Sequence, residues 1–244
     1  LGLCAYLDFP DIAVIKGSGL GGTSLINANV AIIPDKEVLD QTAWPRALNL
    51  EGLLPYYEKS ANILAAGPHP RAMDLLKVKA LDRRAGQMGN KAFGLNIAVN
   101  FQIDGKNLYG VEQKPCIDCG DCVTGCNVGA KNTLAMNYLP LAKNNGTDIF
   151  TQTQADWLEK LPDGGWRVHG RRYGLLGLPE KFTLDAGSVV LSAGSLGTVE
   201  ILLRSELHGL SLSPRVGSGF TGNGDFFGLA YNSDYQTNVL GFGN

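Results

Sequence analysis

Four cysteines fall within eleven residues of this chain, as Cys116-x-x-Cys119-x-x-Cys122-x-x-x-Cys126. The spacing matches the cysteine run with which bacterial ferredoxins bind iron–sulfur clusters. Glycines inside the run give the backbone the freedom that a loop needs to wrap around a compact group. We therefore expect residues 116–126 to form a loop that binds a metal centre through its thiolates, as a [4Fe–4S] or [3Fe–4S] cluster.

Two other uses of the cysteine run stay open. Structural zinc sites usually pair two cysteine knuckles across a longer spacer, and four cysteines this close would form strained disulfides. The spacing therefore favours iron–sulfur ligation over both. Asn127 stands where ferredoxins have a proline. In two-cluster ferredoxins the fourth cysteine serves the other cluster, and this sequence has no second motif, so Cys126 either closes the same cluster or leaves that place to an outside ligand. We expect the fifth cysteine, Cys4, to be a buried apolar residue.

The composition excludes several classes of protein. The 244 residues carry 21 Lys and Arg against 23 Asp and Glu, a net charge of -2, so we expect no nucleic-acid partner. Hydrophobic residues make up 44% of the chain, enough for a core. Because no apolar run approaches the roughly 20 residues that cross a bilayer, we expect no integral membrane segment.

The two ends of the chain have the character of internal sequence. The chain begins Leu1-Gly2-Leu3, without a methionine or a signal-peptide pattern, and stops in the glycine-rich residues 241–244. We expect a fragment of a longer protein, with targeting signals outside it, so that the cellular compartment stays open.

Hydrophobic periodicity and turn residues predict a β-containing region, a helical insertion, the cysteine loop and a second β-rich region. Apolar spacing predicts helices over residues 50–66, 73–88, 133–143 and 196–205. Short apolar or alternating runs predict strands over residues 12–15, 30–33, 93–102, 147–161, 166–172, 182–184 and 188–191. The Pro-Asp-Gly-Gly sequence at residues 162–165 predicts the turn between two of these strands.

The 32 glycines gather in clusters, and the first cluster matches Gly17-x-Gly19-x-x-Gly22. This is the dinucleotide-binding pattern, but that pattern should open a crossover helix before the next strand. Only seven residues separate Gly22 from the run at 30–33, so we reject the dinucleotide fingerprint. Two interpretations remain: a loop whose backbone closely approaches a flat or charged ligand, or an ordinary glycine turn.

Two further glycine clusters follow later in the chain. Residues 188–198 predict a strand, a glycine turn and a helix start, and a helix N-terminus can bind a pyrophosphate. The third cluster spans residues 217–225. A second candidate anion site favours the ligand-binding interpretation of the first cluster.

These segments resemble a known family. Residues 16–27, Lys-Gly-Ser-Gly-Leu-Gly-Gly-Thr-Ser-Leu-Ile-Asn, resemble the flavin-embracing loop of the glucose-methanol-choline (GMC) oxidoreductases, in particular the cholesterol oxidase branch. Residues 191–198 and 216–224 resemble later FAD-contacting segments of that branch, in the same order. The cysteine run is similar to that of a dehydrogenase-type branch of the family.

The resemblance implies a mixed α/β (α+β) fold with a Rossmann-like FAD/NAD(P)-binding domain that is incomplete here. Residues 1–49 and 147–244 would belong to this domain, and residues 50–146 would form a cap or substrate-side insertion that carries the cysteine loop. The implied cofactor contacts are Gly19, Gly21, Gly22, Thr23, Ser24, Asn27, Ala155, Ala193, Gly194 and Asn223.

The implied function is oxidation of the CH–OH group of a small-molecule alcohol of sterol or sugar type. FAD would take a hydride, and electrons would leave through the iron–sulfur cluster to an acceptor protein or a quinone. Lys131 and the helix after it would help to balance the charge of the cluster. Two alternatives stay open: an oxidase that uses O2 and has structural cysteines, and a non-catalytic redox or electron-carrier module.

The resemblance names no catalytic residue in this chain. The catalytic His and Asn of the family would follow residue 244, so this sequence provides no candidate base. The histidines present, His69, His169 and His208, are expected to have structural roles.

Overall fold

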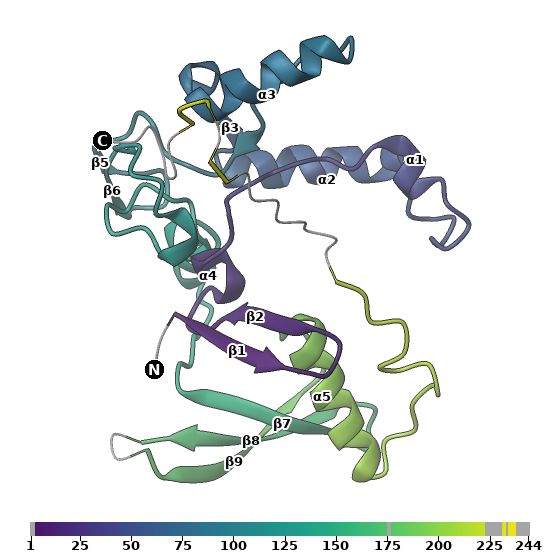
Figure 1. Cartoon of the computed structure of the whole chain (residues 1–244). Coiled ribbons are helices and arrows are strands. Elements are labelled where there is room, and N and C mark those ends of the chain that lie inside the picture. Colours follow the sequence, from purple (N-terminus) through teal and green to yellow (C-terminus); the bar gives the residue numbers. More distant parts are fainter. Residues whose placement is uncertain (1–2, 175–176, 223–230, 233, 238–244) are drawn as a thin grey trace. The chain divides into compact units, whose positions relative to one another are not determined.

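The computed structural model describes residues 3–174, 177–222, 231–232 and 234–237 (Figure 1). Its contacts divide the chain into two compact units. Unit 1 comprises Leu1–Asp148 and Tyr231–Asn244, and unit 2 comprises Ile149–Ala230. Asn223, one of the implied cofactor contacts, lies outside the described residues.

Unit 1 begins with an antiparallel hairpin of β1 (Cys4–Asp8) and β2 (Ala13–Gly17). Alternate residues of β1 are exposed, and Cys4 is among them. The expectation that Cys4 is buried was therefore wrong, because side chains alternate between the two faces of a strand and Cys4 falls on the open face.

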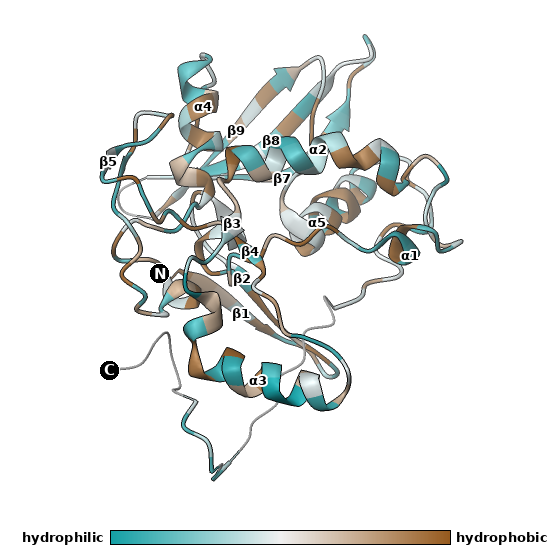
Figure 2. Ribbon diagram, turned by 90° about the horizontal axis from the view of Figure 1, so that it is seen from above, coloured by the Kyte–Doolittle hydropathy of each residue, from teal (hydrophilic) through white to brown (hydrophobic). Residues whose placement is uncertain are grey.

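The helices of unit 1 follow the apolar periodicity of the sequence. The α-helices are α1 (Lys36–Leu39), α2 (Leu50–Ile63), α3 (Leu76–Gln87) and α4 (Tyr138–Asn144). The side chain of Asn49 caps α2 by accepting a hydrogen bond of 2.8 Å from the Gly52 N–H. In Figure 2, α3 carries both hydrophobic and hydrophilic residues, as an amphipathic helix does. The helix predicted over residues 133–143 starts later, because Asn137 has a non-helical backbone (φ -145°).

The strands in the rest of unit 1 are short. They are β3 (Gly67–Pro68), β4 (Asn96–Ile97), β5 (Gly105–Lys106) and β6 (Glu112–Gln113). Two antiparallel pairs result, β3 with β4 and β5 with β6. The strand predicted over residues 93–102 is thus a two-residue strand within a longer extended segment.

That extended segment, residues 96–100, is the centre of unit 1. On one side the Ala98 N–H donates to the Asn29 carbonyl at 2.8 Å. On the other side the Asn100 N–H donates to the Ala130 carbonyl at 2.8 Å, and the Asn132 N–H donates to the Ala98 carbonyl at 2.9 Å. The segment therefore joins the chain just after the first glycine cluster to the chain just after the cysteine run.

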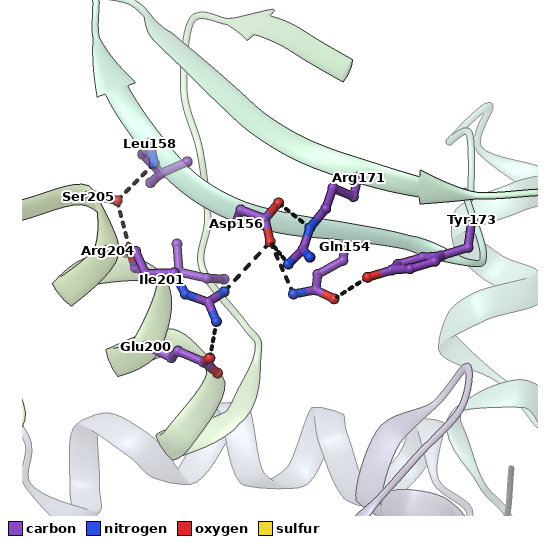
Figure 3. A network of polar contacts seen from close by, with 9 residues as sticks. All are labelled: Gln154, Asp156, Leu158, Arg171, Tyr173, Glu200, Ile201, Arg204 and Ser205. Carbon is purple, nitrogen blue, oxygen red and sulfur yellow. Dashed lines mark hydrogen bonds and ion pairs between the residues drawn. The ribbon is translucent and has the colours of Figure 1, made fainter. Parts of the chain in front are cut away.

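Unit 2 is an antiparallel meander with one helix against it. The strands are β7 (Thr153–Lys160), β8 (Trp166–Tyr173) and β9 (Pro179–Ala186), in that order in the sheet. The predicted turn at residues 162–165 connects β7 to β8, and the Asp163 carboxylate accepts a hydrogen bond from the Gly165 N–H. Helix α5 (Gly194–Leu207) packs on β7 (Figure 3).

Two strand predictions for the Rossmann-like domain differ from the structure. Residues 188–191 form no strand, and an apolar run becomes a strand only where a neighbour accepts its backbone hydrogen bonds. Residues 30–33 make only an isolated bridge, from Val30 to Ile97. The helices and strands together confirm the mixed helix-and-strand class. Every sheet among the described residues is antiparallel, and the Rossmann-like FAD domain stays a prediction. Within the same residues, no helix has the length and apolar character needed to cross a membrane.

Candidate functional site

The first glycine cluster folds into a tight loop that only glycine permits. A Cβ atom on Gly17 would lie 2.2 Å from the Gly22 carbonyl oxygen, closer than any side chain can approach. Gly21 (φ 105°) and Gly22 (φ 54°) have left-handed backbones and open a 3-10 turn, Gly22–Leu25. The loop after β2 thus brings its two ends into backbone contact.

The polar side chains of this loop hold its shape. Thr23 Oγ1 accepts a hydrogen bond of 3.1 Å from the Gly17 N–H. Ser24 Oγ donates to the Gly21 carbonyl at 2.6 Å and accepts from the Leu134 N–H at 3.2 Å. The family resemblance implies that Thr23 and Ser24 contact the cofactor. The structure shows in addition that their side chains stabilise the loop through these hydrogen bonds. Contacts with FAD at Gly19, Gly21, Gly22, Thr23, Ser24 and Asn27 stay a prediction.

The other implied FAD contacts lie in unit 2, at separate points. Ala155 belongs to β7, whereas Ala193 and Gly194 form the start of α5. The neighbour of Ala155, Asp156, pairs with Arg204 at 3.6 Å, and Arg204 lies about 15 Å of helix rise beyond Gly194. The residues of β7 that follow Ala155 therefore contact the last turns of α5, through Asp156 with Arg204 and Leu158 with Ser205.

The four cysteines of the run line one pocket. Cys116, Cys119, Cys122 and Cys126 share it with Lys131 and with apolar residues that include Val99, Val128 and Ala130. All four are free thiols. Within the described residues, however, no three His, Cys, Asp or Glu side chains are arranged to hold a metal ion. The four cysteines thus line one pocket, while their predicted role as ligands of a metal centre stays a proposal.

The surroundings of the thiols differ along the run. Burial raises the pKa of the Cys116 thiol. Burial acts in the same direction on Cys126, but N–H groups from Lys131, Val128, Ala130 and Gly129 outweigh it and lower the pKa of the Cys126 thiol. These donors favour the thiolate, which is the form that binds metals.

A charged cluster fixes the cysteine loop to a distant segment. Asp118 lies within the run, and its Oδ1 is 2.8 Å from His69 Nε2. Because His69 Nδ1 accepts a hydrogen bond of 3.0 Å from the Arg71 N–H, Nε2 carries the proton that bonds to Asp118. The Arg71 guanidinium also pairs with Asp118. No sequence signal pointed to this role of His69, since the two residues are 49 positions apart.

Lys131 joins the cysteine loop to the glycine loop. Its side chain is buried, and its Nζ donates to the Leu25, Asn27 and Cys122 carbonyls at 3.0, 2.8 and 2.8 Å. The three N–H groups of the ammonium are therefore all used by backbone oxygens. Burial lowers the pKa of Lys131, while the nearby Cys122 and Cys126 thiols act in the opposite direction. The sequence singled out Lys131 for its charge alone, and its role as a connection was missed.

The remaining two histidines lie in unit 2. The rings of His169 and His208 stack on Trp157, with centroid distances of 3.6 and 3.9 Å. His169 Nε2 also lies 2.9 Å from Glu159 Oε2. Both imidazoles thus contribute to the packing of unit 2.

Comparisons with known proteins relate most of the chain to one family. A family model described as GMC oxidoreductase matches residues 2–222. Cholesterol oxidase of Mycobacterium tuberculosis is 30% identical over 223 residues, covering 85% of this chain and 38% of that protein. Cholesterol oxidase of Acinetobacter baumannii is 27% identical, covering 82% of this chain and 39% of that protein. An uncharacterized GMC-type oxidoreductase of Sinorhizobium fredii is 26% identical, with 85% and 39% covered. The chain spans about two fifths of these relatives, and it belongs to the GMC oxidoreductase family.

Proposed function

We propose that this chain is part of an FAD-dependent oxidoreductase that acts on the CH–OH group of a small-molecule alcohol of sterol or sugar type. The observation that carries the proposal is the glycine loop, whose close backbone approach at Gly17 and left-handed glycines lie within the family match, in the segment that resembles the flavin-embracing loop of the family. Two of the relatives are named cholesterol oxidases, which favours a sterol among the alcohols.

The residues of the chain would bind and orient FAD. In this proposal, residues 1–49 and 147–244 belong to a Rossmann-like FAD domain, and residues 50–146 form the cap. Gly19, Gly21, Gly22, Thr23, Ser24 and Asn27 would lie against the flavin, while Ala155, Ala193, Gly194 and Asn223 would contact the rest of the cofactor. When bound, FAD would supply two-electron chemistry, as the acceptor of a hydride from the carbon that bears the hydroxyl group, with the hydroxyl proton passing to a base.

We further propose that Cys116, Cys119, Cys122 and Cys126 hold an iron–sulfur cluster. A single zinc ion needs thiolate sulfurs about 2.3 Å from one point. A cluster of several irons spreads its ligands over a larger space, as side chains around a pocket are spread. The apolar lining and the N–H groups directed at Cys126 also suit an anionic cluster. Such a cluster supplies one-electron transfer toward an acceptor protein or a quinone.

The absorption spectrum of the full-length protein, purified without oxygen, tests this proposal. We expect flavin bands together with broad iron–sulfur absorption, and iron and sulfide in the metal analysis. Cys122→Ser should lose the iron–sulfur absorption and keep the flavin bands. The matched control is Cys4→Ser, because Cys4 is exposed and lies outside the run; this variant should keep both features. Zinc without iron would refute the cluster, and a protein without flavin would favour the electron-carrier module.

An oxidase that passes its electrons to O2 is the second candidate, because two relatives are named oxidases. Turnover of sterol and sugar alcohols can be compared with O2 and with a one-electron dye as acceptor. Stoichiometric hydrogen peroxide, with equal turnover in Cys122→Ser, would favour the oxidase. Faster turnover with the dye, lost in Cys122→Ser, would favour the dehydrogenase.

A further inference from the structure

We propose that Lys131 is a positioning residue that couples the two cofactor loops, so that an occupied cysteine pocket tightens FAD binding and bound FAD retains the cluster. The inference rests on the proposed function, since it assumes FAD at the glycine loop and a cluster at the cysteines. It adds that the affinity of each site for its cofactor depends on whether the other site is occupied. Neither cofactor requires this dependence in order to bind.

The first step of the argument is the arrangement of the Lys131 ammonium. Only 2% of this residue is exposed, and its three N–H groups each have one carbonyl acceptor. A buried charge costs several kcal/mol unless its hydrogen bonds are complete. Displacing any one acceptor would leave part of this cost uncompensated. The carbonyls of Leu25 and Asn27 and that of Cys122 therefore constrain one another through a single side chain.

The second step is that the anchor of Lys131 is fixed. Lys131 forms an antiparallel bridge with Val99, and its neighbours Ala130 and Asn132 are hydrogen-bonded to the central segment of unit 1. Val99 and Ala130 are buried and also line the cysteine pocket. Because the backbone of Lys131 is held in this way, its ammonium cannot follow a moving loop without losing another acceptor.

The third step is that each acceptor belongs to a loop with a proposed cofactor. Leu25 and Asn27 come directly after Thr23 and Ser24 in the glycine loop. The carbonyl of Cys122 accepts a hydrogen bond from Lys131 Nζ, and Cys122 also lines the cysteine pocket. A cluster bound by Cys122 therefore fixes the position of the Cys122 carbonyl that accepts from Lys131. Bound FAD fixes the positions of the Leu25 and Asn27 carbonyls in the same way. Coupling of two binding sites is reciprocal, and typical values are about 5- to 150-fold in affinity.

Four full-length proteins test the coupling: wild type, Cys122→Ser, Lys131→Gln and the double variant. Glutamine keeps a long side chain and two N–H donors but removes the charge. The FAD dissociation constant of each deflavinated protein is measured from flavin fluorescence, and iron is measured in parallel. We expect Cys122→Ser to weaken FAD binding by about 5- to 50-fold when Lys131 is present, and by less than about two-fold in the Lys131→Gln background.

The control is Lys143→Gln, the same change at an exposed residue of α4 in the same unit. It should leave both the FAD affinity and the effect of Cys122→Ser unchanged. If Lys131→Gln does not fold, Lys131→Arg keeps the charge, and iron loss to a chelator replaces the affinity measurement. Iron loss from the wild type should be about 5-fold slower with FAD bound, and Lys131→Arg should reduce this ratio.

The outcomes separate this inference from the proposed function. Wild type that binds both iron and FAD, with equal FAD affinity in Cys122→Ser, would overturn the coupling and leave the proposed function intact. Equal weakening in both Lys131 backgrounds would show that the coupling bypasses Lys131, and would overturn the inference too. Wild type without iron would overturn the proposed cluster, and wild type without FAD would overturn the proposed flavin-dependent function. Either result would overturn the coupling as well.

Discussion

Unit 1 and unit 2 satisfy their backbone hydrogen bonds in different ways. In unit 2 three eight-residue strands pair along most of their length, with one irregularity between Ala155 and Trp157 of β7. Ser205 is the only buried polar residue among those described in this unit. In unit 1 the strands are two to five residues long, and the buried polar residues are Asn29, Asn100, Gln113, Lys131, Asn132, Thr133 and Asn137. Irregular backbone needs side chains to replace the partners that a sheet would provide.

The side-chain amides of unit 1 illustrate how side chains take the place of backbone hydrogen-bond partners. Asn107 Oδ1 accepts from the Tyr109 and Val111 N–H groups, and its Nδ2 donates to Gln113 Oε1 and the Met136 carbonyl. The Asn107 side chain thus connects residues 107–113 to the segment at Met136 by hydrogen bonds, as the pairing of two strands would do elsewhere. Unit 1 should therefore be more sensitive than unit 2 to the loss of a single polar side chain.

The largest effect should come from Asn100→Ala in unit 1. Asn100 Oδ1 accepts from the Gln102 and Ile103 N–H groups, and its Nδ2 donates to the Ile103 and Lys114 carbonyls. Because these groups would lose a buried partner, we expect the free energy of unfolding to fall by about 2–4 kcal/mol. Hydrogen exchange should accelerate around residues 100–115 and not in β7 to β9.

The control for this change is Asn90→Ala, the same substitution at an exposed asparagine of unit 1. It should leave exchange unchanged. Equal effects of the two substitutions would contradict the role assigned to buried amides.

A smaller effect is expected from Ser205→Ala in unit 2. Ser205 is fully buried, and its Oγ accepts from the Leu158 N–H at 2.8 Å and donates to the Ile201 carbonyl at 2.7 Å (Figure 3). The change leaves one N–H of the edge strand β7 without its acceptor, so stability should fall by about 1–2 kcal/mol. Faster hydrogen exchange at Leu158 checks this, with Ser211→Ala, an exposed serine, as control. Unchanged exchange at Leu158 would show that β7 does not depend on α5.

The smallest effect on stability is expected from Asp156→Asn in unit 2, and this effect should depend on pH. Hydrogen bonds from Arg171, followed by the charges of Arg171 and Arg204, hold the pKa of Asp156 below its usual value. A carboxyl with a lowered folded pKa stabilises the fold above its unfolded pKa, near 3.9, and loses this as the pH falls through the folded value. Asp156→Asn should therefore cost about 1 kcal/mol at pH 7 and little below about pH 3.

Chemical unfolding followed from pH 7 to pH 2.5 measures this difference. Glu180→Gln on β9 is the control, because Glu180 is an exposed acid of the same unit. A stability loss in Asp156→Asn that stays constant across this range would mean that the charge of Asp156 is not its cause.

Local sequence patterns predicted much of the regular structure. The turn at residues 162–165 and the helices near residues 50, 76 and 194 depend on neighbours within a few positions, and the structure confirms them. The cysteine spacing predicted a loop that binds a metal centre, and this stays a prediction, although the structure places the four residues around one pocket. By contrast, the strand at residues 188–191 was wrong, because an apolar run does not say whether a pairing partner exists.

The connections within the candidate site could not be predicted in this way. Lys131 reaches carbonyls 104 and 106 positions earlier in the chain, and backbone oxygens have no signature in the sequence. The same holds for His69 and Asp118, whose pairing depends on the course of the chain between them. The residue types indicated which chemistry the site can offer, while the long-range hydrogen bonds that connect its parts followed from the fold.

The stack of His169, Trp157 and His208 has a mechanical consequence for unit 2. One ring comes from the middle strand, one from the edge strand, and one from the residue that ends α5. Sliding the helix by a single turn, about 5.4 Å, would pull one imidazole off the indole face. The three rings therefore set the register of the helix against the sheet, much as a bulge or a turn sets the register of two strands.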